Sequence, residues 1–78
     1  MHQSPKVSAE QFATLSERQQ QVATLVVKGL SNKAIAAKLD ITEGTVKSHL
    51  HSIYDKLHIE SRISLMIALA TLIAEIGM

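Results

Sequence analysis

Apolar residues recur at helical spacing in four stretches of the chain. Val46, Leu50, Ile53 and Leu57 follow one another at intervals of three or four residues, as on one face of an α-helix. Similar spacing elsewhere predicts four helices, at about 17–28, 32–39, 43–57 and 62–76. The pattern therefore predicts an all-α, four-helix domain at 15–78, preceded by a linker or N-terminal arm at 1–14 that contains the only proline.

Each predicted helix follows a residue whose side chain is suited to cap it. These residues are Ser16, Ser31, Thr42 and Ser61. A hydroxyl oxygen at that position accepts a hydrogen bond from one of the free backbone N–H groups of the first turn. Gln19 follows Ser16 by three residues, which is the spacing of a capping box. Gly29 suits a left-handed position after the first helix, so both ends of that helix are predicted.

A turn of only three residues, "DIT" at 40–42, joins the second and third predicted helices. So short a turn makes the two helices cross steeply, which is typical of a helix-turn-helix. In that motif the second helix lies in the major groove of DNA, and side chains near its amino-terminal end contact base edges. Lys47, Ser48 and His51 lie there, opposite the apolar stripe. They are candidate base contacts, although they fit a solvated helix face as well.

Candidate contacts to DNA phosphates lie mainly at helix starts, where free N–H groups and the helix dipole attract anions. The candidates are Ser31, Asn32 and Lys33 before and within the second helix, Thr42 before the third, and Lys56 near the end of the third. Ser31 and Thr42 are also the predicted caps, and the two roles are compatible.

The last predicted helix is apolar on nearly every side, and a small domain cannot bury all of it. We expect its core face to consist of Ile63, Met66, Ile67, Ala70 and Ile73. We expect the surplus face to consist of Leu65, Leu69, Leu72 and Ile76. A surplus apolar face typically contacts a partner, so these four residues are a candidate dimer interface. The alternative is that the N-terminal arm covers them through Val7 and Phe12.

Composition narrows the classes of function. A chain of 78 residues has room for one small domain, and the absence of cysteine excludes disulfides and zinc-thiolate sites. His49 and His51 point in different directions on a helix and the acidic residues are scattered, so we expect no catalytic site, metal or cofactor. The first 14 residues lack the apolar run of a signal peptide, and no apolar stretch is long enough to span a membrane, which predicts a cytoplasmic protein.

The segment from Leu15 to about Ala70 resembles the DNA-binding domain of the LuxR/FixJ/NarL family of bacterial transcription regulators. The motifs that carry the resemblance are "GLSNKAIAAKL", "TVKSH" and "IYDKLHIESR", in the family's order and spacing. The resemblance implies base contacts at Lys47, Ser48 and His51 and backbone contacts at Thr45 and the start of the second helix. It also implies dimerisation through the last helix on two-fold-related half-sites.

These observations predict sequence-specific binding of double-stranded DNA by a homodimer. The low net charge of +1 agrees with two copies acting together, since one copy makes few phosphate contacts. The resemblance fits the effector domain of a response regulator in a two-component system, whose receiver or ligand-binding domain lies outside this chain, and it also fits a stand-alone regulator. The rival hypothesis is a helical protein-interaction or dimerisation module that does not bind DNA.

Overall fold

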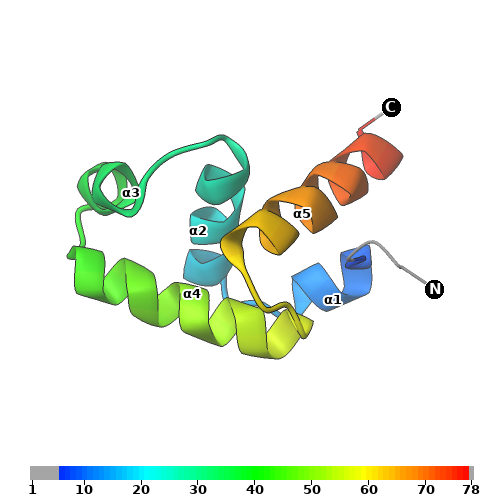
Figure 1. Ribbon diagram of the computed structural model, residues 1–78, viewed down its shortest axis with the longest axis horizontal. Helices are drawn as coiled ribbons and strands as arrows, with labels where there is room; N and C mark the ends of the chain where they lie inside the picture. The colour runs from blue at the N-terminus through cyan, green and yellow to red at the C-terminus, as the bar shows by residue number, and fades with distance from the viewer. Residues whose placement is uncertain (1–5, 78) are drawn as a thin grey trace.

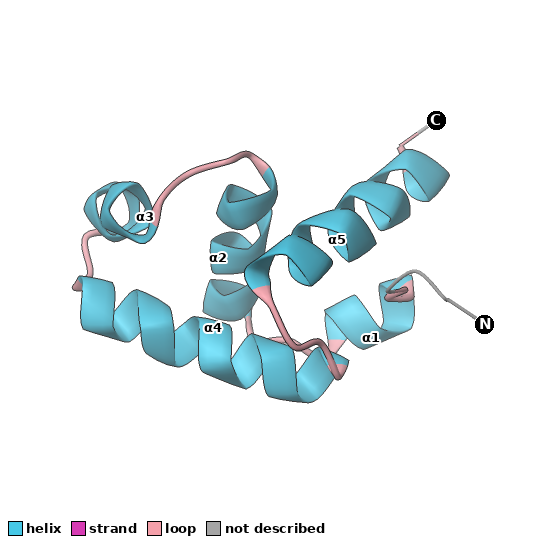
Figure 2. Ribbon diagram, in the orientation of Figure 1, coloured by secondary structure: helices cyan, strands magenta, loops and turns pink. Residues whose placement is uncertain are grey.

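The computed structural model describes residues 6–77, and its regular structure in that range is entirely helical (Figure 2). Five helices follow one another: α1 (Ala9–Ala13), α2 (Glu17–Val27), α3 (Asn32–Leu39), α4 (Glu43–Leu57) and α5 (Arg62–Ile76). The predicted all-α class is confirmed, and the predicted bounds of α2 to α5 agree with the observed ones to within one residue.

The predicted caps are present at the starts of α2 to α5. Ser16 Oγ accepts a hydrogen bond from the Gln19 backbone N–H at 3.1 Å, and Gln19 Oε1 accepts one from the Ser16 backbone N–H at 3.0 Å. This reciprocal pair is the predicted capping box. Ser31, Thr42 and Ser61 each accept from the backbone N–H three residues later, again at 3.1 Å. Local sequence therefore fixes where these helices begin.

Residues with left-handed backbone angles follow the ends of α2, α3 and α4. Gly29 follows α2 at φ +90°, as predicted, and Leu30 donates its backbone N–H to the Leu25 carbonyl at 3.1 Å. Asp40 follows α3 at φ +57°, a conformation that aspartate tolerates better than most residues. This reversal of the chain at Asp40 redirects it within the three-residue turn and lets α4 cross α3.

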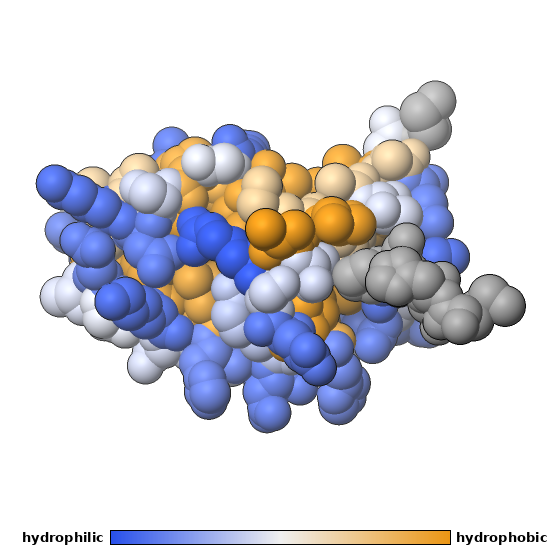
Figure 3. Space-filling model, viewed as in Figure 1, coloured by the Kyte–Doolittle hydropathy of each residue, from blue (hydrophilic) through white to orange (hydrophobic). Residues whose placement is uncertain are grey.

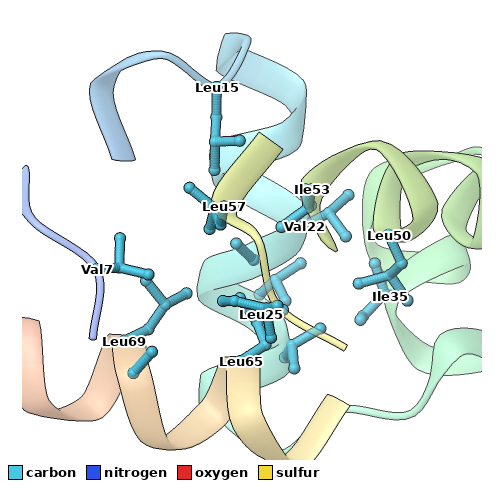
Figure 4. Close-up of a cluster of buried hydrophobic side chains, with 14 of the residues drawn as sticks. Val7, Leu15, Val22, Leu25, Ile35, Leu50, Ile53, Leu57, Leu65 and Leu69 are labelled. Atoms are coloured by element: carbon cyan, nitrogen blue, oxygen red, sulfur yellow. The ribbon is translucent and has the colours of Figure 1, made fainter. Parts of the chain in front are cut away.

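Helix α2 lies at the centre of the domain and packs against α3, α4 and α5 (Figure 1). The largest fully buried side chains come from α2, α3, α4 and α5; they are Val22, Val26, Ile35, Val46, Ile53 and Leu65. Figure 4 shows Val22 of α2 beside Ile53 of α4, and Ile35 of α3 beside Leu50 of α4. The core therefore fixes α4 along one edge of the molecule (Figure 1).

The N-terminal arm contains a helix that the hydrophobic pattern did not predict. Ser8 and Gln11 form a capping box at the start of α1, with hydrogen bonds of 2.9 and 3.1 Å. Val7 is buried in the core and Phe12 packs against it half-buried. The prediction of four helices missed α1 because five residues are too few for helical periodicity to be visible. Residues 7–14 are thus part of the folded unit.

The apolar faces of α5 are the reverse of those predicted. Leu65, Leu69 and Leu72, expected on a partner surface, are 0%, 2% and 7% exposed and belong to the core. Ile63 and Ile67, expected in the core, are 69% and 45% exposed. Ala70 and Ile73 are likewise exposed, and Met66 is half-buried. Of the predicted interface, only Ile76 is exposed, at 63%.

The arm explains part of this reversal. Figure 4 shows Val7 directed toward Leu69 of α5. Phe12 lines a small apolar cavity together with Leu69 and Leu72. Val7 and Phe12 therefore lie against part of the leucine face of α5, as the alternative expectation has it, while α2 also packs against α5. The prediction that Leu65, Leu69 and Leu72 form a dimer interface is wrong, because the chain's own core and arm already occupy that face.

Candidate nucleic-acid interface

The solvent side of α4 carries the predicted base-contacting residues. Lys47, Ser48 and His51 are exposed, while Val46 and Leu50 on the opposite side are buried. Figure 3 shows hydrophilic side chains along the lower edge of the molecule, where Figure 1 places α4. The apolar back of α4 is thus held rigidly while its polar amino-terminal half faces solvent.

The amino-terminal turn of α4 presents two threonine hydroxyls close together. Thr42 Oγ1 lies 2.9 Å from Thr45 Oγ1 and accepts a hydrogen bond from the Thr45 backbone N–H at 3.1 Å. Both residues are exposed. One hydroxyl of this pair donates to the other, so the second keeps a free proton for an external acceptor such as a phosphate oxygen.

The start of α3 lies on the same surface as the amino-terminal half of α4. Asn32 of α3 lines one shallow depression of about 280 Å³ together with Lys47, His51 and Tyr54 of α4 and Arg62 of α5. Ser31 and Lys33, on either side of Asn32, are exposed. The structure therefore brings together two groups of candidates that are about 15 residues apart in sequence.

Lys56 lies apart from this surface. It follows Lys47 by nine residues, which is about two and a half turns, so the two lysines emerge on opposite sides of α4. Lys56 Nζ donates a hydrogen bond to Gln19 Oε1 at 3.0 Å, at the start of α2. The Lys56 ammonium thereby supports the capping box of α2, and it keeps two further N–H donors.

Arg62, the first residue of α5, is a part of the site to which the sequence pattern gave no role. Its Nη1 donates to Asn32 Oδ1 and its Nη2 to the Leu30 backbone carbonyl, both at 2.6 Å. Arg62 thus connects α5 to the segment that opens α3. The motif "IYDKLHIESR" contains Arg62, but only the fold reveals its partners, because they lie 30 and 32 residues earlier in the chain.

Tyr54 lies at the edge of this depression, and its surroundings affect the pKa of its phenol. Partial burial raises the pKa of Tyr54 above its ordinary value of 10.0, and the nearby positive charge of Arg62 opposes this effect. The phenol is therefore neutral at physiological pH. Its aromatic ring packs half-buried against the core at the edge of the depression.

Two further observations on residues 6–77 concern metal binding and membrane crossing. No group of three or more His, Cys, Asp or Glu side chains in that range is placed to hold a metal ion. None of its helices has both the length and the apolar composition that crossing a membrane requires.

Helices α3 and α4, the tight turn between them and the exposed polar half of α4 define a helix-turn-helix domain. The family model of bacterial regulatory proteins, luxR family, matches residues 13–69. This match covers most of the chain, which therefore belongs to the luxR family. The resemblance seen in the sequence is confirmed.

Similar proteins include several transcription regulators. The chain is 45% identical over 60 residues to the response regulator protein TodT of Pseudomonas putida, covering 74% of this chain and 26% of TodT. It is 39% identical over 59 residues to the putative HTH-type transcriptional regulator YhjB of Escherichia coli K12, covering 76% of this chain and 30% of YhjB. The chain thus spans less than a third of the length of these curated relatives.

A solved structure has the same fold. The response regulator StyR superposes with a TM-score of 0.71 at 41% sequence identity, covering 85% of this chain and 31% of the StyR chain. This likeness places the five helices of the present chain within a fold already seen in a response regulator.

Proposed function

We propose that this chain is a sequence-specific DNA-binding domain of a bacterial transcription regulator and that α4 lies in the major groove. The observation that supports this most strongly is that Lys47, His51 and Asn32 line one exposed surface, built from both helices of the helix-turn-helix. The family and the regulator relatives support the same function. The major groove is wide enough to admit one α-helix.

In this proposal three residues of α4 contact base edges. The Lys47 ammonium donates to guanine O6 and N7, or to a phosphate where the base does not offer them. Ser48 is short enough for the helix backbone to approach the groove closely. His51, one turn after Lys47, donates from its ring to an acceptor on the next base pairs.

The phosphate contacts flank α4 on two sides. On one side are Ser31, Asn32 and Lys33, at the start of α3. Thr42 and Thr45 hydroxyls lie at the start of α4. Lys56 lies near the carboxyl-terminal end of α4, where its two remaining donors are assigned to a phosphate beside that end of the helix. These contacts orient the helix, while the base contacts specify the sequence.

We further propose that the protein binds DNA as a homodimer through the exposed face of α5. Ile63, Ile67, Ala70 and Ala74 recur at helical spacing and are all exposed, with exposed Ile73 beside them. Figure 3 shows a hydrophobic patch on the face where α5 lies. A second copy is the occupant that a net charge of +1 favours, because two copies double the number of phosphate contacts.

The relatives suggest the setting of this domain. TodT and the nitrate/nitrite response regulator protein NarP of Escherichia coli, 43% identical over 53 residues, are both named response regulators, and this chain covers about a quarter of each. We propose that the domain is the DNA-binding part of a cytoplasmic regulator of this kind, with a receiver or ligand-binding domain outside the given chain. A stand-alone regulator is the second possibility.

Selection from a pool of random duplexes tests the function directly. The wild-type domain is expected to enrich one sequence, and its affinity for that duplex is then measured against unrelated competitor DNA at several salt concentrations. Absence of any preference at low salt, in a folded sample, would reject DNA recognition. A folded dimer without such preference would instead support the interaction module that binds no DNA.

A pair of lysine variants tests the placement of α4. Lys47→Ala is expected to lower affinity by about 1–3 kcal/mol if Lys47 contacts a base, or to reduce the salt slope by about one unit if it contacts a phosphate. Lys28→Ala removes the same charge from the end of α2 that lies away from α4 (Figure 1), and it is expected to change affinity little. Equal losses in the two variants would contradict the placement.

A further inference from the structure

Arg62 occupies a position where its charge does not help its own helix. It is the first residue of α5, and the amino-terminal end of a helix carries partial positive charge, which disfavours a cation there. Its side chain instead reaches the segment that opens α3, with one hydrogen bond to Asn32 Oδ1 and one to the Leu30 carbonyl, each of 2.6 Å. The contacts that Arg62 makes therefore lie at the start of α3 and not in its own helix.

The chemistry of the guanidinium group fixes the orientation of the Asn32 amide. A guanidinium has only N–H donors, so the atom of Asn32 that faces it must be the oxygen Oδ1. The amide nitrogen Nδ2 is then directed away from Arg62. Among residues 6–77 no hydrogen bond donated by Nδ2 is found, and Asn32 is only half-buried. Asn32 thus presents a donor with two N–H groups, with Oδ1 already engaged.

A phosphate group makes the opposite demand. Its unesterified oxygens only accept hydrogen bonds, so an asparagine contributes to a phosphate contact only when Nδ2, and not Oδ1, is presented. An unrestrained asparagine side chain would sample both orientations and many rotamers before binding. Ordering it in advance removes that entropic cost from the binding step.

We propose that Arg62 is a positioning residue for DNA binding: anchored by its hydrogen bond to the Leu30 carbonyl, the guanidinium orients Asn32 so that Nδ2 donates to a DNA phosphate. This inference rests on the proposed function, in particular on the contact of Asn32 with the DNA backbone. In this proposal Arg62 acts on DNA binding through Asn32.

A double-mutant cycle tests this relation on the duplex selected by the wild-type protein, at one fixed salt concentration. The substitution at position 62 is Arg62→Lys. It keeps the positive charge but replaces the guanidinium, whose two nitrogens donate to two acceptors, with a single ammonium. Asn32→Ala removes the amide. The four proteins of the cycle are the wild type, the two single variants and the double variant, and each is first shown to be folded by its circular dichroism and thermal melting.

The loss of DNA affinity in Arg62→Lys is expected to depend on the presence of Asn32. In the wild-type background, Arg62→Lys is expected to weaken DNA binding about two- to tenfold. This loss corresponds to the free-energy cost of ordering one side chain on binding. Asn32→Ala weakens binding about tenfold, the equivalent of one hydrogen bond to a charged acceptor. In the Asn32→Ala background, Arg62→Lys has almost no further effect. Equal losses from Arg62→Lys in both backgrounds would overturn the proposal.

Nuclear magnetic resonance of the free protein gives a readout that DNA affinity alone does not. The Asn32 side-chain amide signals are expected to show restricted motion in the wild type and increased motion in Arg62→Lys. Unchanged motion would overturn the positioning role even if both variants bind weakly. Failure of the wild type to bind any duplex has a different meaning, since it rejects the proposed function before any variant is compared.

Discussion

Replacement of two neighbouring apolar residues of α5 distinguishes its core face from its exposed face. Leu65 is 0% exposed, whereas Ile63, two residues earlier on the same helix, is 69% exposed. Leu65→Ala and Ile63→Ala each truncate a four-carbon side chain to a methyl group. The two substitutions therefore differ mainly in what surrounds the side chain.

The expected magnitudes follow from burial. Truncation of a fully buried leucine removes its transfer free energy and leaves a cavity, which together cost about 2–5 kcal/mol. A domain of this size has a total free energy of unfolding of roughly 4–12 kcal/mol, so Leu65→Ala removes a large part of it. Ile63→Ala is expected to change stability by less than about 0.5 kcal/mol, because little area is lost and alanine has a higher helix propensity than isoleucine.

Urea denaturation followed by circular dichroism measures both effects. A loss of about 3 kcal/mol in Leu65→Ala corresponds to a decrease in melting temperature of about 12–24 °C for a domain of this length. The measurements are made at low protein concentration, where the wild-type midpoint does not depend on concentration and dimer formation makes no contribution. Similar destabilisation by the two variants, or a larger effect of Ile63→Ala, would refute the assigned orientation of α5.

Three further variants test other parts of the structure. Gly29→Ala, at φ +90° with no atom near the added Cβ, should cost about 1 kcal/mol in urea unfolding through backbone strain; an unchanged midpoint would contradict the left-handed helix end. Ile67→Glu should stay folded but shift sedimentation from dimer to monomer; an intact dimer would reject the exposed α5 face as the interface. Burial raises the pKa of Tyr54, so its stabilising contribution is complete below the unfolded-state pKa and is lost as pH rises through the folded-state pKa. Stability should therefore decrease above pH ~10, and less steeply in Tyr54→Phe; identical pH profiles would contradict this contribution.

Local sequence signals predicted much of the fold. The bounds of α2 to α5 agree because each start depends on a hydroxyl and an N–H group three residues apart, as at Ser16 and Gln19. The buried side of α4 was predicted for the same reason, since Val46, Leu50, Ile53 and Leu57 form a narrow apolar stripe with polar residues opposite. A stripe of that kind has only one side that can face a core.

Helix α5 lacked such a signal, and its orientation was predicted wrongly. With apolar residues around most of its circumference, rotation of the helix exchanges one apolar face for another, and the sequence alone offers no preference. Contact with α2 and with Val7 and Phe12 of the arm decides which face is buried. The arm itself was underestimated, because the helix within it is too short to show periodicity.

The candidate site likewise has one part that the sequence predicts and one part that only the tertiary structure reveals. The sequence by itself determined which residues carry the polar face of α4, because Lys47, Ser48 and His51 are placed by helical spacing on one rigid element. Only the tertiary structure decided that Asn32 joins them and that Arg62 holds it, because hydrogen bonds between residues 30 positions apart depend on how helices pack. Helix periodicity and capping act over three or four residues and can be deduced from sequence, whereas the rotation of α5 and the contacts of Arg62 arise from packing between distant segments.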